Sequence, residues 1–326
     1  MSMTYIKIEN PGVLSTVQDA GRYGYQGLGF PVSGCMDMRA YHDANSLLNN
    51  DPDDAVIEMQ LMGVRVRFLG NAFFAVTGAK MSMQLNGHEI SGYRAYEAHD
   101  GDVLSIGAAL SGRFAYLAVS GGITVDAVMG SRSTNLKCHL GGFEGRALQA
   151  GDVLPVGQGS EWLDNLYLKE MIQPLYEKKL VVRVIAGPQE DHFTDKGLSD
   201  FEEKEYVVSE KSDRMGYRLE GPPIEMKKGA DILSDGIVFG SIQVAADGKP
   251  MILMADRQTT GGYAKIATVI RADLPRLSQS VPGTEIRFRF VSLKEAQKIN
   301  KKYSSEMKKF DRKSGYVRRK RGKQNG

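Results

Sequence analysis

The sequence is poor in cysteine, proline and tryptophan, and these shortages exclude several classes of protein. Its 326 residues include only two cysteines, so the chain cannot be a secreted domain stapled by disulfides. Eleven prolines are too few for a proline-rich disordered chain. No apolar run approaches the ~20 residues of a membrane-spanning helix, and the first ten residues lack the basic start and apolar block of a secretory signal. These absences predict a cytoplasmic globular protein without membrane association.

Positive charge is scarce in most of the chain and is concentrated at its end. Residues 301–326 hold 11 of the 42 Lys and Arg but only 2 of the 39 Asp and Glu, so the preceding 300 residues carry a net charge of −6. A nucleic-acid-binding protein carries its basic surface on the folded domain, so this distribution disfavours nucleic acid as a partner. Residues 311–326, where the apolar pattern fades, are predicted to form a disordered basic tail.

Glycine is abundant, at 37 residues, and the pattern around it predicts a mainly β fold. Apolar residues alternate with arginine over 64–68 and 286–290, as they do in half-buried strands. Residues 72–76 and 114–119 are apolar enough for fully buried strands. Glycines between such segments supply tight turns. We therefore predict a β-rich α+β protein with two lobes.

The length predicts about two domains, and helical patterns mark their limits. Residues 158–180 have apolar residues at helical intervals and are predicted to form a linker helix. This helix would separate an N-terminal β-rich lobe, residues 1–157, from a C-terminal β-rich lobe, residues 181–310, which ends in an amphipathic helix. Asp37 is predicted to cap another helix that runs to about residue 49.

Motifs for nucleotide, metal and nucleophilic chemistry are missing. There is no G-x-x-x-x-G-K-[ST] phosphate loop and no G-x-G-x-x-G, so the chain offers no standard nucleotide cradle. Its five histidines lack the spacing of metal ligands, which predicts no metal site. No G-x-S-x-G elbow is present. Lys227 lies in I-E-M-K-K-G, which lacks the second methionine of a biotin-attachment turn, so we expect no biotin on this chain.

Four polar, glycine-rich strings are present instead. Each places arginine or aspartate, together with hydroxyl or amide groups, beside glycines that let a ligand approach the backbone. Such loops commonly carry function on a rigid scaffold. The first string is T-V-Q-D-A-G-R-Y-G with F-P-V-S-G-C-M-D (residues 16–37), the second G-S-R-S-T-N-L with G-G-F-E-G-R (130–146), the third S-D-R-M-G-Y-R-L-E-G (212–221), and the fourth I-L-S-D-G-I-V-F-G-S-I-Q-V through L-M-A-D-R-Q-T-T-G-G-Y (232–263).

The charged residues of the strings are open to two interpretations. A guanidinium presents a planar fork to a carboxylate or phosphate, so the arginines are candidate anion-binding residues, and the aspartates could orient them or act as bases. Alternatively, aspartate and arginine pair with each other and brace long loops. The residues concerned are Arg22, Arg132, Arg214 and Arg257, with Asp19, Asp213 and Asp256.

Four pieces of the strings occur in the order and spacing of one family. They are T-V-Q-D-x-G-R, G-S-R-S-T-N, S-D-R-M-G-Y-R-L-E-G and A-D-R-Q-T-T-G-G-Y. From about residue 6 to residue 290 the chain resembles the second component of allophanate hydrolase, also called the C subunit of 5-oxoprolinase, a family that includes the KipA antagonist of a sporulation kinase inhibitor. The resemblance implies a cyclophilin-like β-barrel architecture. It also implies work with the A and KipI-like B subunits of 5-oxoprolinase, which together hydrolyse 5-oxo-L-proline to L-glutamate with ATP.

The ATP-dependent hydrolysis of a lactam suggests a chemical role for residues of each string. Phosphorylation of the lactam carbonyl oxygen would create a better leaving group, and the missing phosphate loop leaves ATP binding to a partner or a shared interface. The substrate carboxylate requires a cation, and glutamine side chains can bond the lactam amide. We expect catalytic roles for Asp19, Arg22, Asp213 and Arg214. We expect substrate contacts from Gln18, Ser33, Asp37, Arg132, Ser133, Asn135, Gln243, Asp256, Arg257, Gln258 and Thr259.

Three other functions stay open from the sequence. A related region forms part of the carboxyltransferase domain of urea carboxylase, so the chain could be the carboxyltransferase subunit of a biotin-dependent urea or amide carboxylase. A KipA-like chain would bind a kinase inhibitor and perform no chemistry. RNA binding through the basic tail would show a strong salt dependence that disappears on deletion of residues 311–326.

Overall fold

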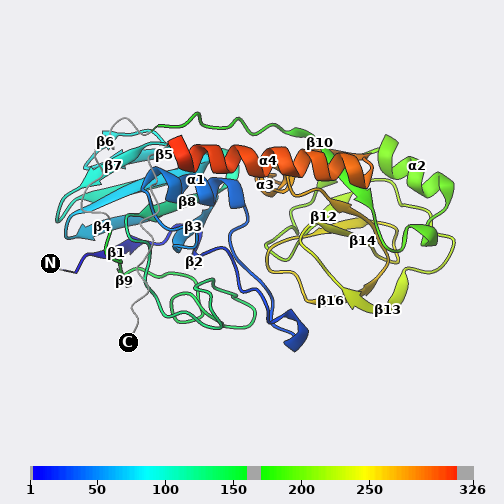
Figure 1. The fold of residues 1–326 in the computed structure, drawn as a ribbon, viewed down its shortest axis with the longest axis horizontal. Helices are drawn as coiled ribbons and strands as arrows, with labels where there is room; N and C mark the ends of the chain where they lie inside the picture. Colours follow the sequence, from blue (N-terminus) through cyan, green and yellow to red (C-terminus); the bar gives the residue numbers. More distant parts are fainter. Residues whose placement is uncertain (1–2, 160–169, 314–326) are drawn as a thin grey trace.

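The computed structural model describes residues 3–159 and 170–313, which form two β-rich lobes with a long helix across both (Figure 1). The N-terminal lobe is a curled nine-stranded sheet in the order β2-β3-β8-β4-β1-β9, in which β5 also pairs with β8, β6 and β7. Its strands are β1 (Tyr5–Asn10), β2 (Leu14–Gln18), β3 (Val56–Gln60), β4 (Arg65–Leu69), β5 (Ala72–Leu85), β6 (His88–Glu89), β7 (Ala95–Ala98), β8 (Val103–Val119) and β9 (Val153–Pro155).

The C-terminal lobe is a closed barrel in the order β10-β17-β14-β15-β12-β11-β18, with a separate two-stranded ribbon formed by β13 and β16. Its neighbouring strands pair antiparallel, except that β10 pairs parallel with β18 to close the barrel. The strands are β10 (Lys179–Ala186), β11 (Glu205–Val208), β12 (Gly216–Glu220), β13 (Asp231–Gly236), β14 (Ser241–Val244), β15 (Pro250–Leu253), β16 (Thr260–Tyr263), β17 (Lys265–Val269) and β18 (Glu285–Phe290).

The helices are short except for the last. They are the 3-10 turns η1 (Gln26–Leu28) and η3 (Glu190–His192), and the helices α1 (Met38–Leu47), α2 (Asp195–Glu203), α3 (Leu274–Ser278) and α4 (Leu293–Lys313). As predicted, Asp37 caps α1, accepting hydrogen bonds from the backbone nitrogens of Arg39 and Ala40. None of the helices in the described ranges is long and apolar enough to span a lipid bilayer.

The alternating patterns form strands as predicted, because alternate side chains of a strand face opposite sides of the sheet. In β4 the side chains of Val66 and Phe68 are buried, whereas Arg65 and Arg67 both pair with Glu9 of the neighbouring β1. Two strands are longer than the buried runs suggested. β5 and β8 extend far beyond residues 72–76 and 114–119, through positions that are partly exposed.

The predicted linker helix is not present in the part of 158–180 that the structure describes, and residues 160–169 lie outside the described residues. Residues 170–178 instead cross from the first lobe to β10 as an extended segment (Figure 1). Met171 donates its backbone N–H to the Tyr93 carbonyl oxygen at 2.8 Å, which fixes the start of the crossing. Pro174 lacks an N–H and biases Gln173 toward extended backbone, so a helix is disfavoured there.

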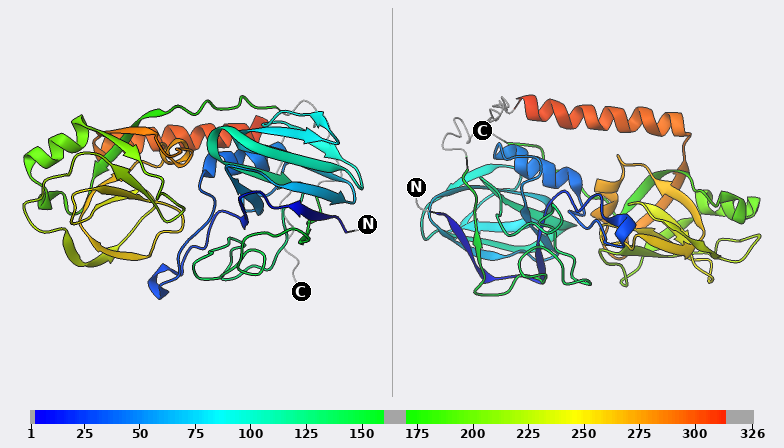
Figure 2. Two further views of the ribbon diagram at one scale, coloured as in Figure 1. Left: turned by 180° about the vertical axis from the view of Figure 1, so that it is seen from behind. Right: turned by 60° about the horizontal axis from the view of Figure 1, so that its bottom comes forward.

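A single apolar cluster joins the two lobes. It includes Tyr41 and Leu47 of α1, Tyr116 of β8, and inward-facing barrel residues such as Phe288. Helix α4 lies along the same side of both lobes (Figure 1), and Figure 2 shows it there from two further directions. Because α4 ends at Lys313, residues 311–313 of the predicted tail are helical, and residues 314–326 lie outside the described residues.

Candidate functional site at the junction of the two lobes

Asp19, directly after β2, joins the first string to the second. Its side chain is 6% exposed and accepts hydrogen bonds from four donors, three at Oδ1 and one at Oδ2. These contacts hold the carboxylate in a fixed position between the two strings. The structure therefore shows Asp19 as a brace, and its catalytic role stays a prediction. The donors are the backbone nitrogens of Gly21 and Arg132 and the hydroxyls of Ser131 and Ser133.

Arg22 lies completely buried beneath the second string. Its Nε donates to the Val128 carbonyl oxygen at 3.0 Å and its Nη2 to the Ser133 carbonyl oxygen at 2.9 Å, while its Nη1 has no partner among the described residues. Burial lowers the pKa of Arg22, and the charges of Asp19 and Asp256 offset this effect only in part. Gly141 covers the guanidinium at a positive φ of 66°, and a Cβ there would lie 2.6 Å from Nη2. Only glycine therefore fits above this arginine.

Four other predicted residues support the same two strings. Asn135 donates its side-chain nitrogen to the Ser33 hydroxyl at 3.0 Å, and Ser33 itself has a positive φ of 56°. Gln18 donates to the Thr134 carbonyl oxygen at 3.0 Å, and its Oε1 is buried without a partner. The half-buried Arg132 donates its Nε to a backbone carbonyl oxygen at 2.8 Å. These side chains shape the loop, and Gln18 keeps one acceptor available.

Arg214 ties the third and fourth strings to the first lobe. Its Nε and Nη2 contact the two carboxylate oxygens of Asp256 at 2.8 and 3.1 Å, and its Nη1 pairs with Glu58 of β3. Nη2 also donates to the Gly34 carbonyl oxygen at 2.7 Å. Burial by itself lowers the pKa of Arg214, but the two carboxylates outweigh it and raise the pKa above its ordinary value. All three nitrogens are engaged, so this predicted catalytic arginine is an inter-lobe tie.

Asp37, a predicted substrate contact, is instead the buried cap of α1. Besides its two backbone donors it accepts from Nε2 of Gln279 at 2.8 Å, and Gln279 also bonds the backbone of Arg113 and Phe114. Burial raises the pKa of Asp37 to about 6. Sequence reasoning missed Gln279, for which no local signal exists. It also missed Glu58, whose position inside the apolar run V-I-E-M was a usable sign of a buried, paired carboxylate.

Arg257 differs from Arg214 although both are buried. Its side chain is 7% exposed, lies over the ring of Phe239 at 5.6 Å, and donates only Nη1 to the carbonyl oxygens of Met254 and Ala255 at 3.2 and 3.4 Å. Its Nε has no partner, and no described carboxylate lies within ion-pair distance. Desolvation lowers the pKa of Arg257. Within the described ranges, Arg257 is therefore a buried cation that forms no ion pair.

The remaining predicted residues of the third and fourth strings make fewer contacts with the buried residues at the junction. Asp213 is exposed and accepts from the backbone nitrogen of Met215 at 2.8 Å, which closes a turn. Gln258 is exposed and Thr259 half-buried. Gln243 is buried, donates to the Tyr263 carbonyl oxygen at 3.2 Å, and keeps an unpartnered Oε1. Asp213 and Gln258 therefore stay outside the buried cluster.

The four strings nevertheless meet. Asp19 connects the first to the second, Asp256 connects the fourth to Arg214 of the third, and Gly34 connects the first to Arg214. The charge of Asp256 also raises the pKa of both Arg22 and Arg257 against the effect of burial, although within the described residues it pairs with neither. The junction thus combines cations and amide acceptors that can bind a small anion and an amide N–H. We call these residues the junction cluster.

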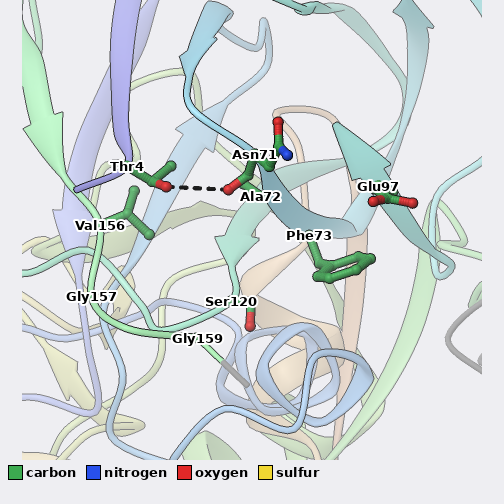
Figure 3. Close-up of a pocket in the computed structure, with 9 residues that line it drawn as sticks. All are labelled: Thr4, Asn71, Ala72, Phe73, Glu97, Ser120, Val156, Gly157 and Gly159. Carbon is green, nitrogen blue, oxygen red and sulfur yellow. Dashed lines mark hydrogen bonds between the residues drawn. The ribbon is translucent and has the colours of Figure 1, made fainter. Parts of the chain in front are cut away.

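Three pockets lie on the N-terminal lobe, and one of them, of about 440 Å³, is lined by residues of β5 and β8 such as Met83 and Leu110. Another, of about 200 Å³, is lined by Thr4, Phe73, Glu97 and Ser120, with Gly157 at its rim (Figure 3). It contains no residue of the four strings, so we do not place the site there. The third, of about 430 Å³, is lined by residues 141–145 of the second string. Among the described residues, no three histidine, cysteine, aspartate or glutamate side chains gather as metal ligands would.

Comparison with known proteins agrees with the two-lobed, mainly β fold. Residues 28–290 match the family model described as carboxyltransferase domain, subdomain A and B. The chain is 39% identical over 289 residues to the 5-oxoprolinase C subunit of Haemophilus influenzae, covering 88% of this chain and 92% of the relative. It is 38% identical over 294 residues to the 5-oxoprolinase C subunit of Escherichia coli, covering 90% and 93%.

Solved structures show the same architecture. The urea carboxylase of Kluyveromyces lactis superposes with a TM-score of 0.85 at 29% identity, and the match covers 95% of this chain but 29% of that chain. The predicted β-rich barrel fold is therefore confirmed. With a family model over most of its length and near full-length relatives above 30% identity, the chain belongs to the family of the carboxyltransferase domain, subdomain A and B.

Proposed function

We propose that this chain is the C subunit of a cytoplasmic 5-oxoprolinase complex. With the A and KipI-like B subunits, it would hydrolyse 5-oxo-L-proline to L-glutamate at the expense of ATP. The two relatives named as 5-oxoprolinase C subunits support this assignment, because each aligns with this chain over about nine-tenths of its own length.

The observation that carries the proposal is the pair of buried guanidiniums in the junction cluster that lack a carboxylate. An unpaired buried charge is costly, and an anionic ligand at this position would offset that cost. The substrate 5-oxoproline supplies both a carboxylate and an amide. Arg22 and Arg257 supply the cations, and the unpartnered Oε1 atoms of Gln18 and Gln243 can accept an amide N–H.

The reaction opens a five-membered lactam. Phosphoryl transfer from ATP to the lactam oxygen weakens the C–N bond; water then adds to the carbon, the C–N bond breaks, and the nitrogen takes a proton to become the amine of glutamate. ADP and phosphate leave. A base must accept a proton from water. In this chain Arg214 pairs with both Glu58 and Asp256, and hydroxyl and backbone donors hold Asp19, which supports a partner protein as the source of the base.

The test is reconstitution from co-expressed A and B subunits with and without this chain. We expect glutamate formation from 5-oxoproline, in step with ADP release, only when all three proteins and ATP are present. Arg218, an exposed arginine of β12, provides a matched control, so the complex with R218Q should turn over normally. Equal glutamate formation without this chain would contradict the proposal.

The urea carboxylase structure favours one alternative, a carboxyltransferase subunit of a biotin-dependent urea or amide carboxylase. The two functions separate by partner and co-substrate. Transfer of labelled bicarbonate to urea, dependent on a biotin-carrying partner, would support the carboxyltransferase and exclude the hydrolase. Binding to a kinase inhibitor without any turnover would support a KipA-like regulator instead.

A further inference from the structure

The described residues include four buried arginines, and they differ in how they use one edge of the guanidinium. The N–H groups of Nε and Nη2 point the same way and form the fork that grips both oxygens of a carboxylate. The contacts of this edge therefore show whether an arginine already has its anion. The four are Arg22, Arg113, Arg214 and Arg257.

This protein repeatedly fills that fork with its own carboxylates. Arg214 grips Asp256 through Nε and Nη2 at 2.8 and 3.1 Å. The half-buried Arg183 grips Asp273 through the same two nitrogens at 2.9 and 2.5 Å. In both cases the planar match of two donors and two oxygens fixes the side chain.

In two of the buried arginines, backbone carbonyl oxygens occupy the fork wholly or in part. Arg22 uses Nε and Nη2 on the carbonyl oxygens of Val128 and Ser133. Arg113 donates Nη2 to the Ser212 carbonyl oxygen at 2.6 Å and lies over the ring of Tyr217 at 5.0 Å. Neither can present two parallel N–H groups to a ligand without giving up a bond to the scaffold.

Arg257 alone among the buried four keeps both nitrogens of its fork without a partner in the described chain. Its hydrogen bonds are confined to Nη1, which holds the opposite edge against two backbone carbonyl oxygens. The ring of Phe239 supports the face of the guanidinium. Asp256, the neighbouring carboxylate, is already clasped by Arg214 and so cannot turn to fill the fork. The side chain is thus held in place through Nη1, while Nε of the fork is buried and has no partner among the described residues.

We propose that the Nε/Nη2 fork of Arg257 binds the carboxylate of a small acid, in the same geometry in which Arg214 binds the carboxylate of Asp256. That the acid is 5-oxoproline rests on the function proposed above. Because Phe239 and two carbonyl oxygens already fix the guanidinium, little rotamer entropy is lost on binding.

The test is a titration of the ¹⁵N-labelled full chain, monitored at the arginine Nε–H resonances and assigned with R257K. Four probes are added separately: 5-oxoproline, acetate, 2-pyrrolidinone (the same lactam without its carboxylate) and inorganic phosphate. We expect 5-oxoproline to shift the Arg257 resonance and 2-pyrrolidinone to leave it unchanged. R257K, which keeps the charge but loses the fork, should weaken 5-oxoproline binding about 10- to 100-fold, whereas R218Q should bind normally.

The outcomes separate this proposal from the proposed function. A shift with acetate but not with 5-oxoproline supports the carboxylate fork and contradicts the proposed substrate. A shift with phosphate alone, equal shifts with 5-oxoproline and 2-pyrrolidinone, or no shift with any probe overturns the fork. If R257K does not fold, the wild-type titration decides, with the Arg257 resonance assigned by through-bond correlation from its own backbone.

Discussion

At the scale of single residues, the junction is governed by the cost of burying charge. A buried carboxylate or guanidinium is tolerated when hydrogen bonds or an opposite charge surround it. Asp19 meets this requirement with four donors, and Glu58 and Asp256 meet it through Arg214. Arg257 does not meet it within the described chain. Residue type alone therefore does not separate residues that brace the loops from residues that are free to bind a ligand, whereas the contacts show which residues act as braces.

Replacing Asp19 tests its role as a brace. Asp19→Ala leaves two hydroxyls and two backbone N–H groups unsatisfied, so we expect a loss of about 3–5 kcal/mol in the free energy of unfolding. Urea denaturation at neutral pH measures this loss. Asp126→Asn is the matched control, since Asp126 is exposed and should change stability by less than about 0.5 kcal/mol. A fully stable but inactive Asp19→Ala chain would restore the catalytic role expected from the sequence.

At the scale of elements, α1 begins at the cap Asp37, whose burial disfavours its ionised form. Asp37 satisfies the free N–H groups of the first turn, yet it is 2% exposed and lies deep between the lobes. Because burial disfavours the ionised form, its pKa rises to about 6. The cap therefore stabilises the helix through hydrogen bonds, while its charge lowers the stability of the protein at neutral pH.

This raised pKa predicts a specific pH dependence. The unfolded carboxyl titrates near pH 4 and the folded one near pH 6, so the folded state binds the proton more tightly between these values. The contribution of Asp37 to stability should therefore fall as pH rises from 4 to 6, by up to about 3 kcal/mol, and be constant above that range.

The measurement is the difference in free energy of unfolding between wild type and Asp37→Asn across pH 4 to 7. Asparagine is also a good cap, although its amide would meet the Nε2 of Gln279 and add a constant penalty. The pH slope of the difference is diagnostic and the offset is not. A flat difference curve would show that Asp37 titrates normally in the folded protein.

At the scale of the whole molecule, the two lobes share a core at their junction, beside a second core that lies within the N-terminal lobe. The largest apolar cluster contains α1 residues, the end of β8 and the barrel interior, and the Glu58–Arg214–Asp256 network crosses the same junction. Chains of this length often unfold in stages because their domains have separate cores. Here neither lobe can unfold without exposing apolar surface of the other.

We therefore expect a single calorimetric transition for the described fold, with the van't Hoff and calorimetric enthalpies in agreement. Arg214→Gln, which leaves Glu58 buried and unpaired, should lower the melting temperature without splitting the transition. Two resolved transitions in the wild-type chain would contradict a shared core. Two transitions in the variant alone would show that the ionic network, and not the apolar cluster, couples the lobes.

The sequence by itself determined what depends on neighbours along the chain. Strand alternation placed β4 and β18, Asp37 marked the start of α1, and the four strings identified the segments that meet at the junction. Residues 170–178 are extended although their apolar spacing predicts a helix, because Pro174 and the contact with Tyr93 outweigh that spacing.

Only the tertiary structure decided which charge meets which. The partners Glu58 and Arg214 are 156 residues apart, and Gln279 and Asp37 are 242 apart, so no local pattern could pair them. Long-range pairing depends on how the strands close into two lobes, and it assigns Asp256 to Arg214 while leaving its neighbour Arg257 with a free fork. The separation between scaffold and binding residues is therefore a property of packing.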